Sequence, residues 1–339
     1  MKVLVTDPLS HVGIQLFQET PDIEVDVRTG ISAGELKDII HNYEGLVIRS
    51  ATRVTADILA SARKLRVIGR AGIGLDNVDI AEASRRGIVV MNTPEGNTIT
   101  TAEHTMAMMM AISRNIPQAT TSLKSGKWEK KAFKGRELFN KTLGLIGAGH
   151  IGRIVADRAR GMKMKVIVFD PYLKPETVEK LDLEPVSLDE LLARADYVTV
   201  HTPKTEETFD MINRDALAKM KKDAILLNCA RGGIVNEEAV CEALESGRLA
   251  GAAFDVFTIE PPEGNRLMNL DNFICTPHLG ASTQEAQDNV AKEVAEQIIA
   301  YLLHGSVKNA VNVPSISTEL MTVLRPYAIL LERMGSLQA

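Results

Sequence analysis

The sequence predicts an α/β protein built from two doubly wound parallel sheets, and three observations lead to that class. Its 339 residues exceed the usual size of one domain. Apolar residues make up 45% and charged residues 24%, which suits a folded chain with a large core. Short apolar, β-branched runs alternate with longer helical segments along almost the whole chain, as in parallel sheets covered by helices. Two series of such runs are present, so we expect two sheets.

The first series predicts five strands, separated by segments long enough for crossover helices. These strands are Lys2–Thr6, Glu24–Val27, Leu46–Arg49, Val67–Arg70 and Ile88–Met91. The second series predicts six strands, the full count of the larger doubly wound fold. They are Leu143–Ile146, Lys165–Phe169, Tyr197–His201, Ala224–Asn228, Ala250–Phe254 and Asn272–Thr276.

Two predicted helices lie at the passages between the series. Thr100-Thr101-Ala102-Glu103 and Ser282-Thr283-Gln284-Glu285 both have the pattern of a capping box, in which a hydroxyl and an acid or amide close the first turn. After the second helix the chain reaches Val311–Pro314, a short extended segment that could return to the first sheet. We therefore expect a discontinuous first domain, formed by residues 1–95 and 286–314, around a second domain of residues 96–285.

Charge and cysteine content exclude several classes of protein. The chain has 39 Lys and Arg against 44 Asp and Glu, so it lacks the basic excess that would favour nucleic acid. It has no apolar run of about 18 residues and no leader pattern at its start, which predicts a cytoplasmic protein that does not bind membranes. Cys229, Cys241 and Cys275 lie at no metal-ligand spacing, so we expect neither a disulfide nor a metal.

A glycine-rich turn is the strongest single motif. Gly147-Ala148-Gly149-His150-Ile151-Gly152 joins a predicted strand to a helix, where the first glycine allows a tight turn, the second a close approach to a pyrophosphate and the third close packing. The next strand ends at Asp170, eighteen positions after Gly152. A carboxylate there accepts hydrogen bonds from ribose hydroxyls and repels a 2′-phosphate. The sequence therefore predicts NAD binding, in preference to NADP.

Three polar residues follow strands of the second series, at the edge where open α/β sheets bind ligands. Arg231 could hold a carboxylate bidentately and polarise the adjacent carbonyl. His278 could exchange a proton with an alcohol or a carbonyl, and Glu260 could fix its tautomer. Taken singly, each fits a structural role as a loop anchor better than a functional one.

Together, these motifs resemble the D-isomer-specific 2-hydroxyacid dehydrogenases. The glycine turn with Asp170, the segment Asn228–Asn236, the segment Asp255–Pro262 and the segment Pro277–Ser282 have the order and spacing of that family. The resemblance covers residues 1–314. It implies a Rossmann NAD domain inserted into a discontinuous flavodoxin-like substrate domain, with a cleft between the two.

The resemblance also implies residue roles. It makes Arg231 the residue that binds the substrate carboxylate and carbonyl, His278 the general acid and base, and Glu260 its partner. For the cofactor, the implied residues are Gly147, Gly149, His150, Ile151, Gly152, Asp170, Thr202, Cys229, Ala230, Arg231, Asp255, His278, Gly280 and Ala281. For the substrate, they are Arg49, Arg70, Gly72, Ile73, Gly74 and Asn97.

Several segments are similar to members of the family that act on a phosphorylated 2-hydroxy acid. They are Arg49–Thr52, Gly69–Asp79, Asn92–Asn97 and Gly126–Lys131. A second anionic group needs more positive charge than Arg231 supplies. Arg49, with Arg53, Arg70 or Lys130–Lys131, could provide it.

Other functions remain open on the sequence alone. One is a glyoxylate, hydroxypyruvate or D-lactate type reductase, and another is an NAD-sensing corepressor-like binding protein. Residues 315–339 are expected to open a helical extension of the kind that leads into regulatory domains in many members of this branch. Methionines on the helix after Thr100, together with the resemblance, predict a homodimer.

Overall fold

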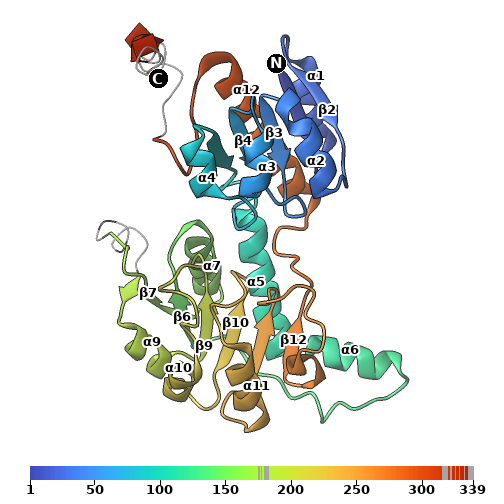
Figure 1. Ribbon diagram of the computed structural model, residues 1–339. Helices are drawn as coiled ribbons and strands as arrows, with labels where there is room; N and C mark the ends of the chain where they lie inside the picture. The colour runs from blue at the N-terminus through green and yellow to red at the C-terminus, as the bar shows by residue number, and fades with distance from the viewer. Residues whose placement is uncertain are drawn as a thin grey trace. The chain divides into compact units, whose positions relative to one another are not determined.

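A computed structural model describes residues 1–174, 176, 178, 183–314, 320, 323, 324, 326, 327, 329–331, 333 and 334. The chain divides into two compact units. Unit 1 comprises Met1–Asn97 and the chain from Thr283, and unit 2 comprises Thr98–Ser282. Each unit is a parallel sheet with helices on both faces, as predicted (Figure 1).

Unit 1 contains a five-stranded parallel sheet in the order β2-β1-β3-β4-β5. Its strands are β1 (Lys2–Val5), β2 (Glu24–Val27), β3 (Gly45–Ile48), β4 (Val67–Arg70) and β5 (Val89–Asn92). Its helices are α1 (His11–Glu19), α2 (Ala33–Ile39), the short 3-10 helix η1 (Ile40–Asn42), α3 (Ala56–Ser61), α4 (Ile80–Arg85) and α12 (Gln284–His304). The direction of the strand order reverses between β1 and β3, which is where sheets of this type bind ligands.

Alternation along the strands produces the two cores of unit 1. Val3 and Val5 of β1 pack with α1 and α12 on one face, whereas Leu4 packs with α2, α3 and α4 on the other. After α12 the chain returns to β5, where the Val311 N–H donates to the Val90 carbonyl at 2.9 Å. The segment after α12 thus contacts β5 through an isolated bridge between Ala310 and Met91.

Unit 2 contains a seven-stranded parallel sheet in the order β12-β11-β10-β9-β6-β7-β8. Its strands are β6 (Thr142–Ile146), β7 (Lys165–Phe169), β8 (Glu184–Pro185), β9 (Tyr197–Val200), β10 (Ile225–Asn228), β11 (Gly251–Phe254) and β12 (Phe273–Cys275). Its helices are α5 (Thr98–Ser113), α6 (Ile116–Lys124), α7 (His150–Gly161), α9 (Leu188–Arg194), α10 (Arg214–Lys219), α11 (Glu237–Glu245) and the 3-10 helix η2 (Arg266–Asn269). The order reverses between β6 and β9, the dinucleotide-binding position of a Rossmann sheet.

Three sequence predictions were wrong in detail. The second sheet has seven strands instead of six, because the two-residue strand β8 pairs with β7 at the edge. Helix α5 begins at Thr98, two residues before the predicted capping box, since Thr98 and Thr101 are both buried in its first turns. Helix α12 is capped by Thr283, whose hydroxyl accepts from the Ala286 N–H, so its cap lies one residue after the predicted Ser282.

The predicted extension at residues 315–339 falls largely outside the described residues. Those of its residues that are described, Leu320, Leu324, Ile329 and Leu331 among them, have helical backbone. In the described part of the chain, no helix combines the length and apolar character needed to cross a membrane.

Candidate active site

The glycine turn between β6 and α7 leaves space on one side. Gly147 has φ +92°, and a Cβ there would lie 2.8 Å from the His201 carbonyl oxygen, so the turn requires glycine. Gly149 caps α7, and a Cβ on it would meet no atom within 4 Å. A group approaching this backbone therefore meets the N–H groups of the first turn of α7, which is the arrangement that binds diphosphates.

Asp170 follows β7 and lies beside the same turn. One carboxylate oxygen accepts from the Ala148 N–H at 2.8 Å and the other from the Tyr172 N–H at 2.9 Å. These bonds fix the half-buried carboxylate near the turn. A carboxylate oxygen can accept a second hydrogen bond, so Asp170 is able to bind ribose hydroxyls as predicted. The turn and this acid together fit NAD.

The end of β9 supplies two polar side chains to the same place. The Thr202 Oγ1 and His201 Nδ1 atoms are buried and have no hydrogen-bond partner among the described residues. Burial lowers the pKa of His201 to about 4, so this imidazole is neutral at pH 7. Thr202 was a predicted cofactor residue, whereas His201 was not singled out. Its position after a strand next to the reversal in strand order is the signal that could have found it.

Arg231 lies in a turn that follows β10. The Asn228 side chain closes this turn by accepting from the Ala230 N–H at 3.1 Å and donating to the Arg231 carbonyl at 3.0 Å. A Cβ on Gly232 would lie 1.9 Å from the Phe257 carbonyl oxygen, so the turn packs directly against the segment after β11. The backbone of the Arg231 turn and that of the segment leading to Glu260 are therefore neighbours.

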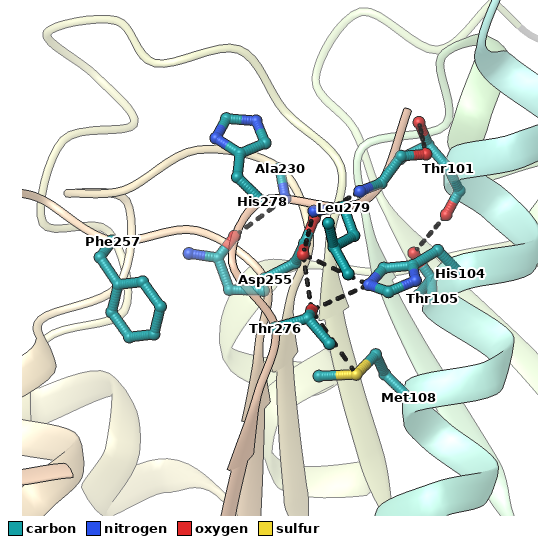
Figure 2. A network of polar contacts seen from close by, with 12 residues as sticks. Thr101, His104, Thr105, Met108, Ala230, Asp255, Phe257, Thr276, His278 and Leu279 are labelled. Carbon is teal, nitrogen blue, oxygen red and sulfur yellow. Dashed lines mark hydrogen bonds and ion pairs between the residues drawn. The ribbon is translucent and has the colours of Figure 1, made fainter. Parts of the chain in front are cut away.

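His278 and Glu260 form a side-chain pair. The His278 Nδ1 atom lies 2.8 Å from Glu260 Oε2, and Glu260 Oε1 accepts from the Phe257 N–H at 3.0 Å. The two side chains are 50% and 38% exposed, so the pair is open to a ligand. His278 has φ +57°, in the left-handed region, which directs its side chain away from the buried residues around it (Figure 2).

Asp255 is the buried centre of this edge of the sheet, at 1% exposure. Its Oδ1 accepts from the Thr276 hydroxyl at 2.6 Å and lies 3.3 Å from the His104 ring (Figure 2). Its Oδ2 accepts from the Gly280 N–H at 2.8 Å. Asp255 was predicted to face the nicotinamide, and this role stays a prediction; within unit 2 both of its carboxylate oxygens accept hydrogen bonds. Sequence reasoning missed His104, which comes from α5.

Cys229 cannot act as a nucleophile at neutral pH. Burial, followed by the charge of Asp255, raises the pKa of its thiol to about 12. All three cysteines are free thiols. In the described part of the chain no cluster of His, Cys, Asp and Glu is arranged to hold a metal.

In unit 1 the predicted substrate residues lie at or after the ends of β3, β4 and β5. The Arg49 N–H donates to the buried Asp7 carboxylate at 2.5 Å, and its guanidinium donates to the Pro8 carbonyl at 3.1 Å. The Gly72 N–H donates to the Thr93 hydroxyl at 2.7 Å. That N–H is therefore bound within the protein, although the loop as a whole was predicted to present its N–H groups to a carboxylate.

The remaining predicted substrate residues differ in exposure. Arg70 lies over Gly72, since a Cβ on Gly72 would be 2.2 Å from its guanidinium. Arg53, Lys130 and Lys131 are exposed, and Asn97 is buried at the end of the first stretch of unit 1.

Comparisons with known proteins agree with this geometry. Residues 106–280 match the family model described as D-isomer specific 2-hydroxyacid dehydrogenase, NAD binding domain. The chain belongs to the D-isomer-specific 2-hydroxyacid dehydrogenases. Residues 147–152 and Asp170, which carry the fit to NAD, lie within the matched range of this family's NAD-binding domain.

Similar proteins cover nearly all of this chain. It is 49% identical to the D-3-phosphoglycerate dehydrogenase of Synechocystis sp., over 99% of this chain and 60% of that protein. It is 48% identical to the protein of the same name from Methanocaldococcus jannaschii, over 99% of this chain and 64% of that one. The crystal structure of the TT0316 protein from Thermus thermophilus is 37% identical, with a TM-score of 0.84, over 92% of this chain and all of that one. The chain thus spans somewhat less than two thirds of the two curated relatives.

Proposed function

We propose that this dehydrogenase oxidises D-3-phosphoglycerate to 3-phosphohydroxypyruvate with NAD, the first step of L-serine synthesis. The observation that carries the proposal is the 2.8 Å pair of His278 and Glu260, at the carboxyl edge of the sheet that also holds the glycine turn. The two similar proteins named D-3-phosphoglycerate dehydrogenase support the choice of substrate.

Each step requires a specific group of unit 2. Bound at the glycine turn and Asp170, NAD would supply the acceptor for a hydride from the substrate carbon. Because Glu260 holds His278 through Nδ1, the Nε2 atom is the one that takes the hydroxyl proton. Glu260 compensates the positive charge that the imidazole then carries. Arg231 binds the substrate carboxylate and polarises the forming carbonyl, the chemistry for which a guanidinium is suited.

The cofactor is expected to be NAD rather than NADP. Both Asp170 oxygens are anchored by backbone N–H groups, so the carboxylate cannot turn away from a 2′-phosphate without losing these bonds. A comparison of kcat/KM for NAD and NADP, in the wild type and in Asp170→Ala, tests this point. Equal use of both cofactors by the wild type would contradict it.

The substrate is tested by a panel of acids followed at 340 nm. We expect 3-phosphoglycerate to be used with much higher kcat/KM than D-glycerate or D-lactate. Equal efficiency on the phosphorylated and unphosphorylated acids would instead favour a hydroxypyruvate or D-lactate type reductase. Binding of peptides without turnover of any acid would favour the corepressor-like interpretation.

We also propose a cytoplasmic homodimer. The methionines on which the dimer prediction rests differ in exposure. Met106 and Met109 are buried in the core of unit 2, whereas Met110 is 40% exposed. The nearby apolar side chains of Ile116 and Leu123, on α6, are also exposed. Isologous contact between two copies would cover such surface. Sedimentation that shows a monomer at micromolar concentration would contradict the proposal.

A further inference from the structure

Three consecutive backbone N–H groups converge on one residue beside the acid–base pair. The His278 N–H donates to the Asp255 carbonyl oxygen at 2.9 Å. The Leu279 and Gly280 N–H groups donate to the Asp255 carboxylate at 2.7 and 2.8 Å. Asp255 thus holds the backbone on both sides of the His278 side chain.

This contact compensates an unfavourable backbone conformation. A non-glycine residue in the left-handed region is strained and persists only where its surroundings impose it. His278 has φ +57°, and its neighbours on the C-terminal side are bound to a buried carboxylate. Displacement of Asp255 would let the 278–280 backbone relax, and the His278 ring would then move relative to Glu260.

The Asp255 carboxylate is in turn held by α5. The His104 Nε2 atom lies 3.0 Å from the Thr276 hydroxyl and 3.3 Å from Asp255 Oδ1 (Figure 2). Thr101, one turn earlier, donates to the Gly280 carbonyl at 3.0 Å, so the same face of α5 binds both the carboxylate and the loop. Burial alone would raise the pKa of Asp255, but hydrogen bonds, first from His104 and then from Thr276, bring it below the usual aspartate value.

His104 is the group that distinguishes this arrangement from simple packing. Among the described residues it is the only basic side chain within ion-pair distance of Asp255. The nearby Cys229 thiol is neutral because burial raises its pKa to about 12. Arg158 of α7, another basic residue beside α5, pairs with Glu103 at 3.7 Å and not with Asp255. The carboxylate therefore depends on His104 and on the Thr276 hydroxyl for its side-chain hydrogen bonds.

We propose that His104 is a positioning residue for the acid–base pair. Through Asp255 and the Thr276 hydroxyl it fixes the 276–280 segment, and this segment sets the orientation of His278 toward Glu260. The effect on turnover rests on the proposed dehydrogenase function, whereas the effect on the pair itself does not.

The test compares substitutions that keep or remove the N–H donor. His104→Phe keeps the ring volume and removes the donor, whereas His104→Gln places an amide N–H near the Nε2 position. We expect His104→Phe to lower kcat about 10- to 100-fold, the scale of a misplaced catalytic group, and His104→Gln to recover most of the rate. The limb of the pH–rate profile that depends on the His278–Glu260 pair should shift in His104→Phe and remain in place in His104→Gln.

A second readout needs no substrate. In the NMR spectrum of the cofactor-free chain, the His278 Nδ1–H proton bound to Glu260 should give a strongly deshielded signal, which Glu260→Gln identifies by its loss. His104→Phe should weaken or remove this signal. If His104→Phe does not fold, Thr276→Val removes the bridging hydroxyl with little change of shape and should alter the same signal.

Two controls separate positioning from general destabilisation. Met109→Leu changes a buried core residue of α5, and His304→Phe changes an exposed histidine at the end of α12; both should leave kcat and the signal as in the wild type. An unchanged kcat and signal in His104→Phe, or equal losses in Met109→Leu, would overturn the inference. If the wild-type chain oxidises no 2-hydroxy acid but the signal is still lost in His104→Phe, the inference is supported and the proposed function is refuted.

Discussion

Each unit places a buried carboxylate directly after a strand, but the two carboxylates bind different groups. In unit 2, Asp255 follows β11 and binds side chains and backbone around His278, whose side chain pairs with Glu260. In unit 1, Asp7 follows β1 at the reversal in strand order and binds the backbone of Arg49 and Thr52. The side chain of Asn77 completes that turn by donating to the carbonyls of the same two residues.

Under the proposed function, this difference divides chemistry from recognition. A general base must be held within hydrogen-bond reach of the proton that it takes, and in unit 2 the contact with Glu260 holds the His278 side chain. Unit 1 fixes a loop backbone instead, and among the described residues the Arg49 guanidinium donates to the Pro8 carbonyl. Substitutions in unit 2 should therefore act mainly on kcat, and those in unit 1 mainly on KM and on stability.

The largest effect is expected at His278. His278→Asn removes the proton carrier but retains a residue that tolerates positive φ. We expect kcat to fall about 10²–10⁴-fold, with little change in NAD binding measured by calorimetry. The matched control is His304→Asn, on the exposed end of α12. Near-normal turnover by His278→Asn would show that His278 of unit 2 is not the proton carrier.

The next largest effect is expected from a substitution of Arg49, and it should appear mainly in KM. Arg49→Ala removes a charge expected to bind the phosphate, at a cost of about 2–5 kcal/mol in kcat/KM for 3-phosphoglycerate. The residual rate with D-glycerate should change less. Arg63→Ala, at an exposed position of the same unit, is the control. Equal losses on the two acids would show that Arg49 does not distinguish the phosphate.

The features of the fold and of the site that could be predicted from the sequence are those that leave a local pattern in it. Strands of four or five apolar residues and the glycine turn are local patterns, and the predicted Lys165–Phe169 and Val67–Arg70 coincide with β7 and β4. Strand β8 has only two residues, one of them proline, so no period exists to detect. The pairing of Glu260 with His278 was predicted from the family resemblance and from the position of both residues after strands of one sheet. The structure places the two side chains in contact.

The supporting residues could not be predicted in the same way. His104 is one of several polar residues in α5, and its partners Asp255 and Thr276 lie more than 150 positions away in the chain. Asp7 likewise binds residues 42 and 45 positions away. Such contacts depend on which strands become neighbours, and the order of strands in a sheet leaves no local pattern.

A loss of stability between about pH 6.5 and about pH 4 is expected from His201 of unit 2. Because the pKa of folded His201 is about 4, against about 6.5 when unfolded, the unfolded chain binds one more proton between these values. The free energy of unfolding should therefore fall as the pH drops from about 6.5 to about 4, by about 3 kcal/mol from this group. His201→Gln should flatten this dependence. Hydrogen exchange resolved by peptide should show it in β6 and β9, and an equal slope in β1 and β3 would contradict the assignment to unit 2.

The smallest effect should come from Asp7, and it tests the scaffold role of unit 1 directly. The Asp7 carboxylate is 3% exposed and accepts from the Arg49 N–H at 2.5 Å, the Thr52 N–H at 3.2 Å and the Thr52 hydroxyl at 2.7 Å. In Asp7→Asn the new NH2 group faces the Thr52 hydroxyl, which can turn to the Thr6 Oγ1 atom 2.9 Å away, but the bonds to a charged acceptor become bonds to a neutral one, at a cost of about 1 kcal/mol in stability. The loop then holds Arg49 less firmly, so KM for 3-phosphoglycerate should rise a few-fold while kcat stays within about twofold, because the pair in unit 2 is untouched. Asp57→Asn, at an exposed carboxylate of the same unit, should change neither quantity. A loss of kcat without a change in KM would mean that unit 1 takes part in the chemical step, and the division between the two units would then fail.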